Sequence, residues 1–174
     1  SFEQWPDPEV QADIIHQALA KLGVENPVLV GHSWAGSVVM AYLLKYPDAV
    51  AGGVLLAGAT HPWEGGVSSN VQLAGVAVLG KLFTSTLVMP VGQMVFDTAV
   101  EAVFAPEQPT DDYRARTGAV LALRPAAFQA SAEDVRNLSS FLEGQSRRYG
   151  EIKKPLLLVT AENDTIVPAW NHAE

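Results

Sequence analysis

Apolar residues recur every three or four positions near the start of the chain, which predicts an amphipathic helix. Asp7 is the predicted N-cap of this helix, Pro8 its first residue, and Gly23 the residue that ends it. The apolar residues on its buried side are Val10, Ile14, Ile15, Leu19 and Leu22.

Three short apolar runs predict buried strands at residues 27–30, 50–57 and 155–160. Residues 35–46 are apolar on most sides, which predicts a helix buried against a sheet. A strand, a helix and a strand at this spacing form a βαβ unit, whose strands are parallel and whose crossover is right-handed. We therefore expect an α/β fold whose ligands bind at the carboxyl edge of a parallel sheet.

The segment between the second and third predicted strands, residues 62–150, shows helical patterns and no strand. We expect two helices within 71–104 with a break near Pro90, a third over 111–123, and a fourth from Ser131. No run of about 18 residues is free of charges and of glycine or proline breaks, so we expect no membrane span.

These patterns divide the chain into three predicted parts. Residues 1–61 supply part of an α/β core, 62–150 form a helical cap, and 151–174 return to the core with a strand and a loop. The apolar faces of the cap helices are expected to cover the carboxyl edge of the sheet.

Composition excludes several classes of protein. The chain is 48% hydrophobic and 17% charged, so it can bury a core, and its net charge of -8 argues against nucleic-acid binding through phosphates. Cysteine is absent, which excludes disulfides and thiolate metal sites, and the four histidines lack metal-ligand spacing. We therefore expect no metal site. No secretory signal is visible, and a cysteine-free chain fits a reducing compartment, so we favour the cytoplasm.

The candidate chemistry begins in the sequence Gly-His-Ser-Trp-Ala-Gly at 31–36, between the first strand and the buried helix. Such a turn pushes a serine hydroxyl outward and requires a positive φ at Ser33. Ala35 stands where the usual pattern has glycine, and Gly36 is expected to restore some of the room. The backbone N–H of Trp34, at a helix N-terminus, is a candidate oxyanion-hole donor. The alternative is a phosphate-binding or purely structural turn.

A serine nucleophile needs a base, usually a histidine held in orientation by a carboxylate. Asp164 follows the third strand as Ser33 follows the first, so both loops are expected at one edge of the sheet. Glu162 is the competing carboxylate. We favour Asp164 because the surrounding Asn-Asp-Thr turn can aim its side chain inward.

Three further residues are candidates for substrate binding. His61 and Trp63 lie in the loop after the second strand, where they are predicted to line a pocket or, equally, to pack locally. His32 adjoins Ser33, but we expect its ring to point away from the hydroxyl and toward the sheet.

The turn at 31–36, together with Glu-Asn-Asp-Thr-Ile-Val-Pro at 162–168, resembles the α/β-hydrolase superfamily, and most of all its branch with a helical cap. This resemblance covers essentially the whole chain and implies a partial α/β-hydrolase fold. It implies that Ser33 is the nucleophile, Asp164 the acid, and Trp34 the donor of one oxyanion N–H. The implied activity is an esterase-like, cofactor-free serine hydrolase for a small apolar acyl substrate. A carbon–carbon bond hydrolase, a perhydrolase and a non-catalytic binding module remain alternatives.

The resemblance also implies parts that this sequence lacks. The family places the catalytic histidine after one more helix and strand, so we expect it beyond Glu174. His172 obeys the order of the triad but falls where the next helix should begin, and a helix-surface role is preferred for it. The second oxyanion donor normally follows an early strand. Because the chain also starts at Ser1 without methionine, we expect a fragment.

Overall fold

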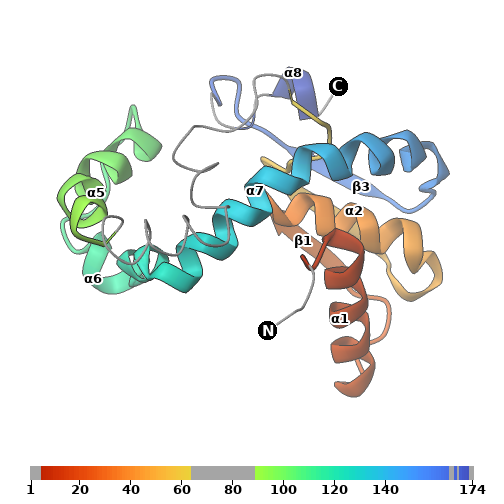
Figure 1. Cartoon of the computed structure of the whole chain (residues 1–174). Coiled ribbons are helices and arrows are strands. Elements are labelled where there is room, and N and C mark those ends of the chain that lie inside the picture. Colours follow the sequence, from red (N-terminus) through yellow and green to blue (C-terminus); the bar gives the residue numbers. More distant parts are fainter. Residues whose placement is uncertain (1–4, 64–88, 165–166, 168, 173–174) are drawn as a thin grey trace. The chain divides into compact units, whose positions relative to one another are not determined.

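A computed structural model of the chain describes residues 5–63, 89–164, 167 and 169–172 (Figure 1). The chain divides into two compact units, Ser1–Gly65 with Asn137–Glu174, and Gly66–Arg136. The three-part division expected from the sequence, with a cap at 62–150, stays a prediction.

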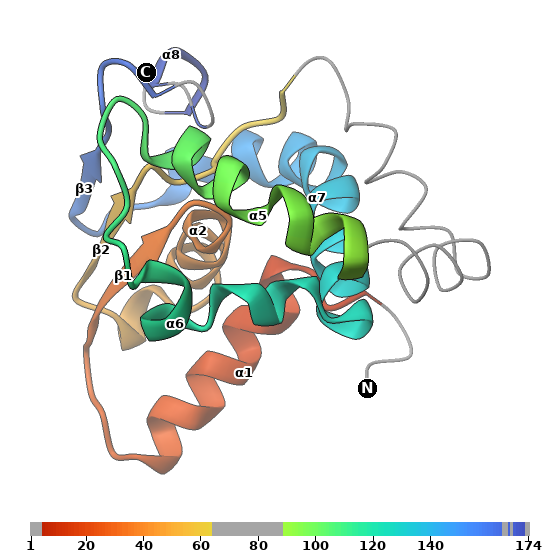
Figure 2. The ribbon, with the colours of Figure 1, turned by 90° about the vertical axis from the view of Figure 1, so that its left-hand side faces the viewer.

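The first unit contains a parallel sheet of three strands, β1 (Val28–His32), β2 (Gly52–Leu56) and β3 (Leu156–Val159), in the order β1-β2-β3 (Figure 2). In the register, Val28 lies opposite Gly52, and Gly53 lies opposite Leu156. The predicted βαβ unit is confirmed. The carboxyl ends of all three strands therefore meet at one edge of the sheet.

One helix precedes β1 and another follows it. Helix α1 (Pro8–Lys21) begins as predicted, because the Asp7 side chain accepts a hydrogen bond from the Val10 N–H at 2.9 Å, and Gly23 follows its end with φ 66°. Helix α2 (Ala35–Lys45) packs against α1, β1 and β2. Its buried residues form most of the core, in a cluster of Ala12, Val38, Val39, Met40, Ala41, Tyr42, Leu43, Val50 and Leu55.

The sequence predicted strands that are buried on both faces, but one face of the sheet is exposed. Side chains alternate along β1, so Leu29 faces α2 and is half-buried, whereas Val28 and Val30 point the other way and are 58% and 63% exposed. Leu157 of β3 is 57% exposed for the same reason. The prediction was wrong at these positions because no described segment covers that face.

The second unit contains α5 (Met89–Phe104), α6 (Tyr113–Thr117), the 3-10 turn η3 (Ala119–Leu123) and the first part of α7 (Pro125–Gln145). Helix α5 begins beside Pro90, where a break between helices was predicted. The first of the two helices expected in 71–104 lies outside the described residues. Among the helices that the structure describes, none is both long and apolar enough to cross a membrane.

Two helix predictions in this region were wrong. The third predicted helix, 111–123, is interrupted by Gly118, whose φ of 61° ends α6 with a left-handed residue. Helix α7 begins at Pro125 and not at Ser131, because proline at a first helical position starts a helix without losing a hydrogen bond. After α7 come the 3-10 turn η4 (Ser146–Glu151), β3 and the short helix α8 (Ala169–His172).

Candidate active site

The turn between β1 and α2 holds Ser33 in the predicted conformation. Its φ is 51°, in the left-handed region that costs a non-glycine residue about 1–2 kcal/mol. The end of β2 fixes this geometry from the side, because the Ser33 N–H donates to the Leu56 carbonyl at 3.0 Å and the Ala59 N–H donates to the Ser33 carbonyl at 2.9 Å. The strained residue is thus held by hydrogen bonds from the neighbouring strand and its loop.

Close backbone contacts explain the glycines of the turn. A Cβ atom on Gly36 would lie 2.7 Å from the Gly58 Cα, and one on Gly31 would lie 2.6 Å from the Ala35 carbonyl oxygen. Ala35 itself is exposed, so its methyl group needs no separation of helix and strand. The glycine that α2 requires is therefore Gly36, which approaches Gly58 of the loop after β2.

Trp34 links the turn to two groups of apolar side chains. Its indole packs against the main core and against the cluster of Ala59, Leu138 and Leu142. Its backbone N–H donates to no group among the described residues, which leaves it available to a ligand at the start of α2. The indole Nε1 is buried and also lacks a partner within the described part of the chain.

The two candidate carboxylates differ in their surroundings. Asp164 is half-buried, its Oδ1 accepts the Val167 N–H at 2.9 Å, and its own N–H donates to the Ala161 carbonyl at 3.2 Å. Glu162 is exposed. Asp164 thus has a fixed hydrogen-bond partner, whereas Glu162 lies in solvent, and the choice of Asp164 as the acid stays a prediction.

Strand order fixes how the candidate loops are arranged. Ser33 follows β1, His61 follows β2 and Asp164 follows β3, all at the carboxyl edge of one parallel sheet. With β2 between them, the ends of β1 and β3 are separated by two strand spacings, or about 10 Å.

The sequence suggested that His172 lies on a helix surface, but the structure buries it, with 6% of the residue exposed. Its Nδ1 accepts N–H groups from Thr60 and His61, each at 3.3 Å. Burial lowers the pKa of His172, as does the neighbouring His61, while Asp164 opposes the shift. A triad base must donate its Nδ1 proton to the carboxylate, and an accepting Nδ1 cannot do so. In this position His172 stabilises the loop after β2.

The other histidine and tryptophan candidates have protein partners. His61 Nδ1 lies 2.9 Å from Thr60 Oγ1, and burial lowers the pKa of the His61 ring. The Trp63 N–H donates to Ser139 Oγ at 3.2 Å, and its side chain packs on the Ala59 cluster. These contacts hold both residues in place, and a role for either in substrate binding stays a prediction. His32 is exposed at the end of β1.

Sequence reasoning missed a cluster of polar side chains beside this turn, formed by the buried Thr60 and Gln145 and the half-buried Tyr149. The signal was a glutamine on an apolar stripe, since Gln145 follows Leu138 and Leu142 at helical spacing on α7. Within the described ranges, no group of three histidine, aspartate or glutamate side chains has the arrangement of a metal site.

The sequence pattern of the family described as alpha/beta hydrolase fold matches residues 5–174. The chain belongs to this α/β-hydrolase family. A strained serine after a parallel strand is the arrangement by which such hydrolases expose their nucleophile. The predictions of the family and of a partial α/β-hydrolase fold are confirmed.

Several named proteins resemble this α/β-hydrolase chain. It is 27% identical to the 2-hydroxy-6-oxononadienedioate/2-hydroxy-6-oxononatrienedioate hydrolase of Klebsiella pneumoniae, across 92% of the chain and 54% of that protein. It is 28% identical to a provisionally named carbamate hydrolase of Cronobacter turicensis, across 90% of the chain and 55% of that protein. The chain thus spans about half the length of the curated relatives that it matches.

Solved structures share the fold at lower identity. An alpha/beta hydrolase fold protein from Burkholderia ambifaria superposes with a TM-score of 0.66 at 16% identity, over 94% of this chain and 58% of that one. Identity at this level supports the architecture and leaves the substrate open.

Proposed function

We propose that the protein is a serine hydrolase that cleaves a carboxylic ester or related acyl compound through an acyl-enzyme. The observation that carries this proposal is the positive φ of Ser33 in a turn closed by Gly31 and Gly36. A residue held in this costly conformation, at the N-terminus of a buried helix, is expected to serve chemistry.

The roles follow from the chemistry of acyl transfer. Ser33 Oγ attacks the carbonyl carbon, and the free backbone N–H of Trp34 donates to the oxygen as it gains negative charge. Asp164 orients the histidine base, which the family order puts beyond Glu174, and that histidine carries the proton from serine to the leaving group. No cofactor takes part. The second oxyanion donor is expected from a loop after an early strand of the sheet.

The expected substrate has a small or medium apolar acyl or alcohol group. This expectation rests on the insertion between β2 and β3, whose described helix α5 is rich in apolar residues. Such a helical insertion is predicted to cover the site and to shield it from bulk water, while a single water molecule enters to hydrolyse the acyl-enzyme and release the acid.

A fluorophosphonate probe tests the proposal on the complete protein. The probe should label Ser33, as located by peptide mass spectrometry, and Ser33→Ala should abolish labelling. Ser140→Ala, at an exposed serine of α7, is the matched control and should label at the wild-type rate. An unlabelled but folded wild-type protein would refute the nucleophile and favour a non-catalytic binding module.

Carbon–carbon bond hydrolysis is the second candidate, and the similarity to the Klebsiella pneumoniae hydrolase favours it. Both reactions use the same serine, so labelling does not separate them. Rates with 2-hydroxy-6-oxononadienedioate and with a short p-nitrophenyl ester do. A kcat/KM at least tenfold higher for the ester supports the esterase, and the reverse order supports the carbon–carbon hydrolase. A perhydrolase would instead require peroxide for its activity.

A further inference from the structure

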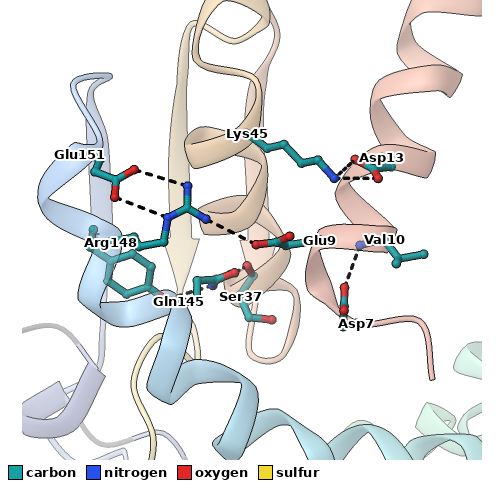
Figure 3. Close-up of polar contacts among 10 residues, drawn as sticks. Asp7, Glu9, Val10, Asp13, Ser37, Lys45, Gln145, Arg148 and Glu151 are labelled. Carbon is teal, nitrogen blue, oxygen red and sulfur yellow. Dashed lines mark hydrogen bonds and ion pairs between the residues drawn. The ribbon is translucent and has the colours of Figure 1, made fainter. Parts of the chain in front are cut away.

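A chain of hydrogen bonds runs from the start of α2 to the loop after β2. Ser37 Oγ donates to the Trp34 carbonyl at 2.6 Å. Gln145 Nε2 donates to the Ser37 carbonyl at 3.0 Å (Figure 3). The same Nε2 donates to Tyr149 Oη at 3.1 Å, and Tyr149 Oη donates to the Thr60 carbonyl at 2.7 Å.

These bonds close a ring around the nucleophile turn. Thr60 directly follows Ala59, whose N–H donates to the Ser33 carbonyl at 2.9 Å. The turn is therefore held on one side by the loop after β2 and on the other by the end of α7. The side chains of Gln145 and Tyr149 connect the two sides, so they complete the ring.

The orientation of the Gln145 amide follows from its partners. The Ser37 carbonyl can only accept, and Tyr149 Oη has given its proton to a carbonyl, so both require the amide nitrogen. Burial raises the pKa of Tyr149 to about 12, which keeps this phenol protonated and able to donate at neutral pH.

The Gln145 amide nitrogen makes two hydrogen bonds, whereas its oxygen carries a cost. Gln145 is 4% exposed, and its Oε1 has no partner among the described residues. A buried unpaired oxygen costs free energy, and an apolar side chain beside Leu138 and Leu142 would avoid that cost. The residue is better explained by what its nitrogen holds in place.

We propose that Gln145 is a positioning residue for the nucleophile turn. Its amide fixes the first turn of α2, and with Tyr149 it keeps Ser33 Oγ and the Trp34 N–H aimed at one point. Neither side chain touches the substrate in this role. The inference rests on the proposed function, because it assigns an effect on the reactivity of Ser33.

The test compares substitutions of the ring in the complete protein. Gln145→Leu removes both polar groups, Gln145→Glu keeps the shape and loses the donor, and Tyr149→Phe removes the connecting hydroxyl. Glu143→Gln, at an exposed position of the same helix, is the matched control. For each variant, the fluorophosphonate labelling rate of Ser33 and the kcat and KM for an ester are measured where the protein is fully folded.

We expect both Gln145 variants to label about ten to a hundred times more slowly and to lose kcat by the same factor, because small displacements of a reacting group are costly. KM should stay within about twofold, since no substrate contact is removed. Tyr149→Phe should give a smaller loss. Glu143→Gln should match the wild type.

Folded Gln145→Leu and Gln145→Glu variants that label at the wild-type rate would overturn the inference and leave the proposed function intact. A wild-type protein that does not label would instead refute the proposed function. If Gln145→Leu fails to fold, the labelling rates of folded Gln145→Glu and Tyr149→Phe decide. Equal losses in kcat and in substrate affinity would indicate a general structural defect and would also overturn the inference.

Discussion

The two loops that carry the candidate nucleophile and acid are held in different ways. The turn around Ser33 is fixed by groups far away in the sequence, through hydrogen bonds to Leu56 and Ala59 and the close approach of Gly36 to Gly58. Asp164 forms hydrogen bonds with Ala161 and Val167, within three residues, and its charge also acts on His172. The Ser33 turn is thus held by backbone contacts with β2 and its loop, whereas these two hydrogen bonds of Asp164 lie within its own segment, and changes in the two should have different consequences.

The largest expected effect is on the acid loop and concerns activity alone. Asp164→Asn should lower kcat by about 10⁴-fold, because an amide holds the histidine in the wrong tautomer. The free energy of unfolding should change by less than about 1 kcal/mol, since the amide oxygen can still accept the Val167 N–H. Ester kinetics and urea titration measure the two quantities. Glu162→Gln is the matched control, and a larger loss of kcat in that variant would reassign the acid.

A change in the turn should affect the fold itself. Gly36→Val places a Cβ 2.7 Å from the backbone of Gly58, which cannot move aside as a side chain would. We expect a loss of about 3 kcal/mol or more in the free energy of unfolding. Gly144→Ala is the control, because its Cβ meets nothing within 4 Å, and a helical alanine should add about 0.5–1 kcal/mol. Equal stability of Gly36→Val and wild type, by urea titration, would contradict the close-packing argument.

A third prediction separates strain from chemistry at Ser33. Both Ser33→Ala and Ser33→Gly remove the nucleophile and should abolish probe labelling. The glycine variant should be the more stable of the two by about 1 kcal/mol, because only glycine adopts a φ near 51° without steric cost. Thermal unfolding of the two variants gives the difference. A more stable alanine variant would show that the turn is not strained.

The same contrast explains what could be predicted from the sequence. The start of α1 and the three parallel strands follow from local patterns such as the Asp7 cap, and the sequence Gly-His-Ser-Trp-Ala-Gly marked the turn at Ser33, so these features were predicted correctly. The roles of Gly58 and Gln145 depend on contacts across the fold, which no local pattern contains.

The wrong predictions have the same origin. The apolar runs of β1 and β3 predicted burial on both faces, but burial depends on which segments cover the sheet, and Val30 stays exposed. The surface role of His172 was inferred from its place where the next helix should begin, and that place does not reveal its hydrogen bonds to the loop after β2. The start predicted at Ser131 was wrong because Pro125, at a first helical position, begins α7 earlier.

The smallest expected effect is on the pH dependence of stability and concerns His172. Burial lowers the pKa of His172 in the folded protein below its ordinary value of 6.5. At a pH between the folded and the unfolded pKa, the unfolded chain therefore binds more protons than the folded one. This contribution to stability is complete above about pH 6.5 and is lost as the pH falls below it. His172→Asn should therefore lose less stability than wild type between pH 7.5 and 5.5 in urea titrations. His32→Asn, at an exposed ring, should follow the wild-type profile. Parallel profiles for wild type and His172→Asn would show that the buried ring does not couple folding to protonation.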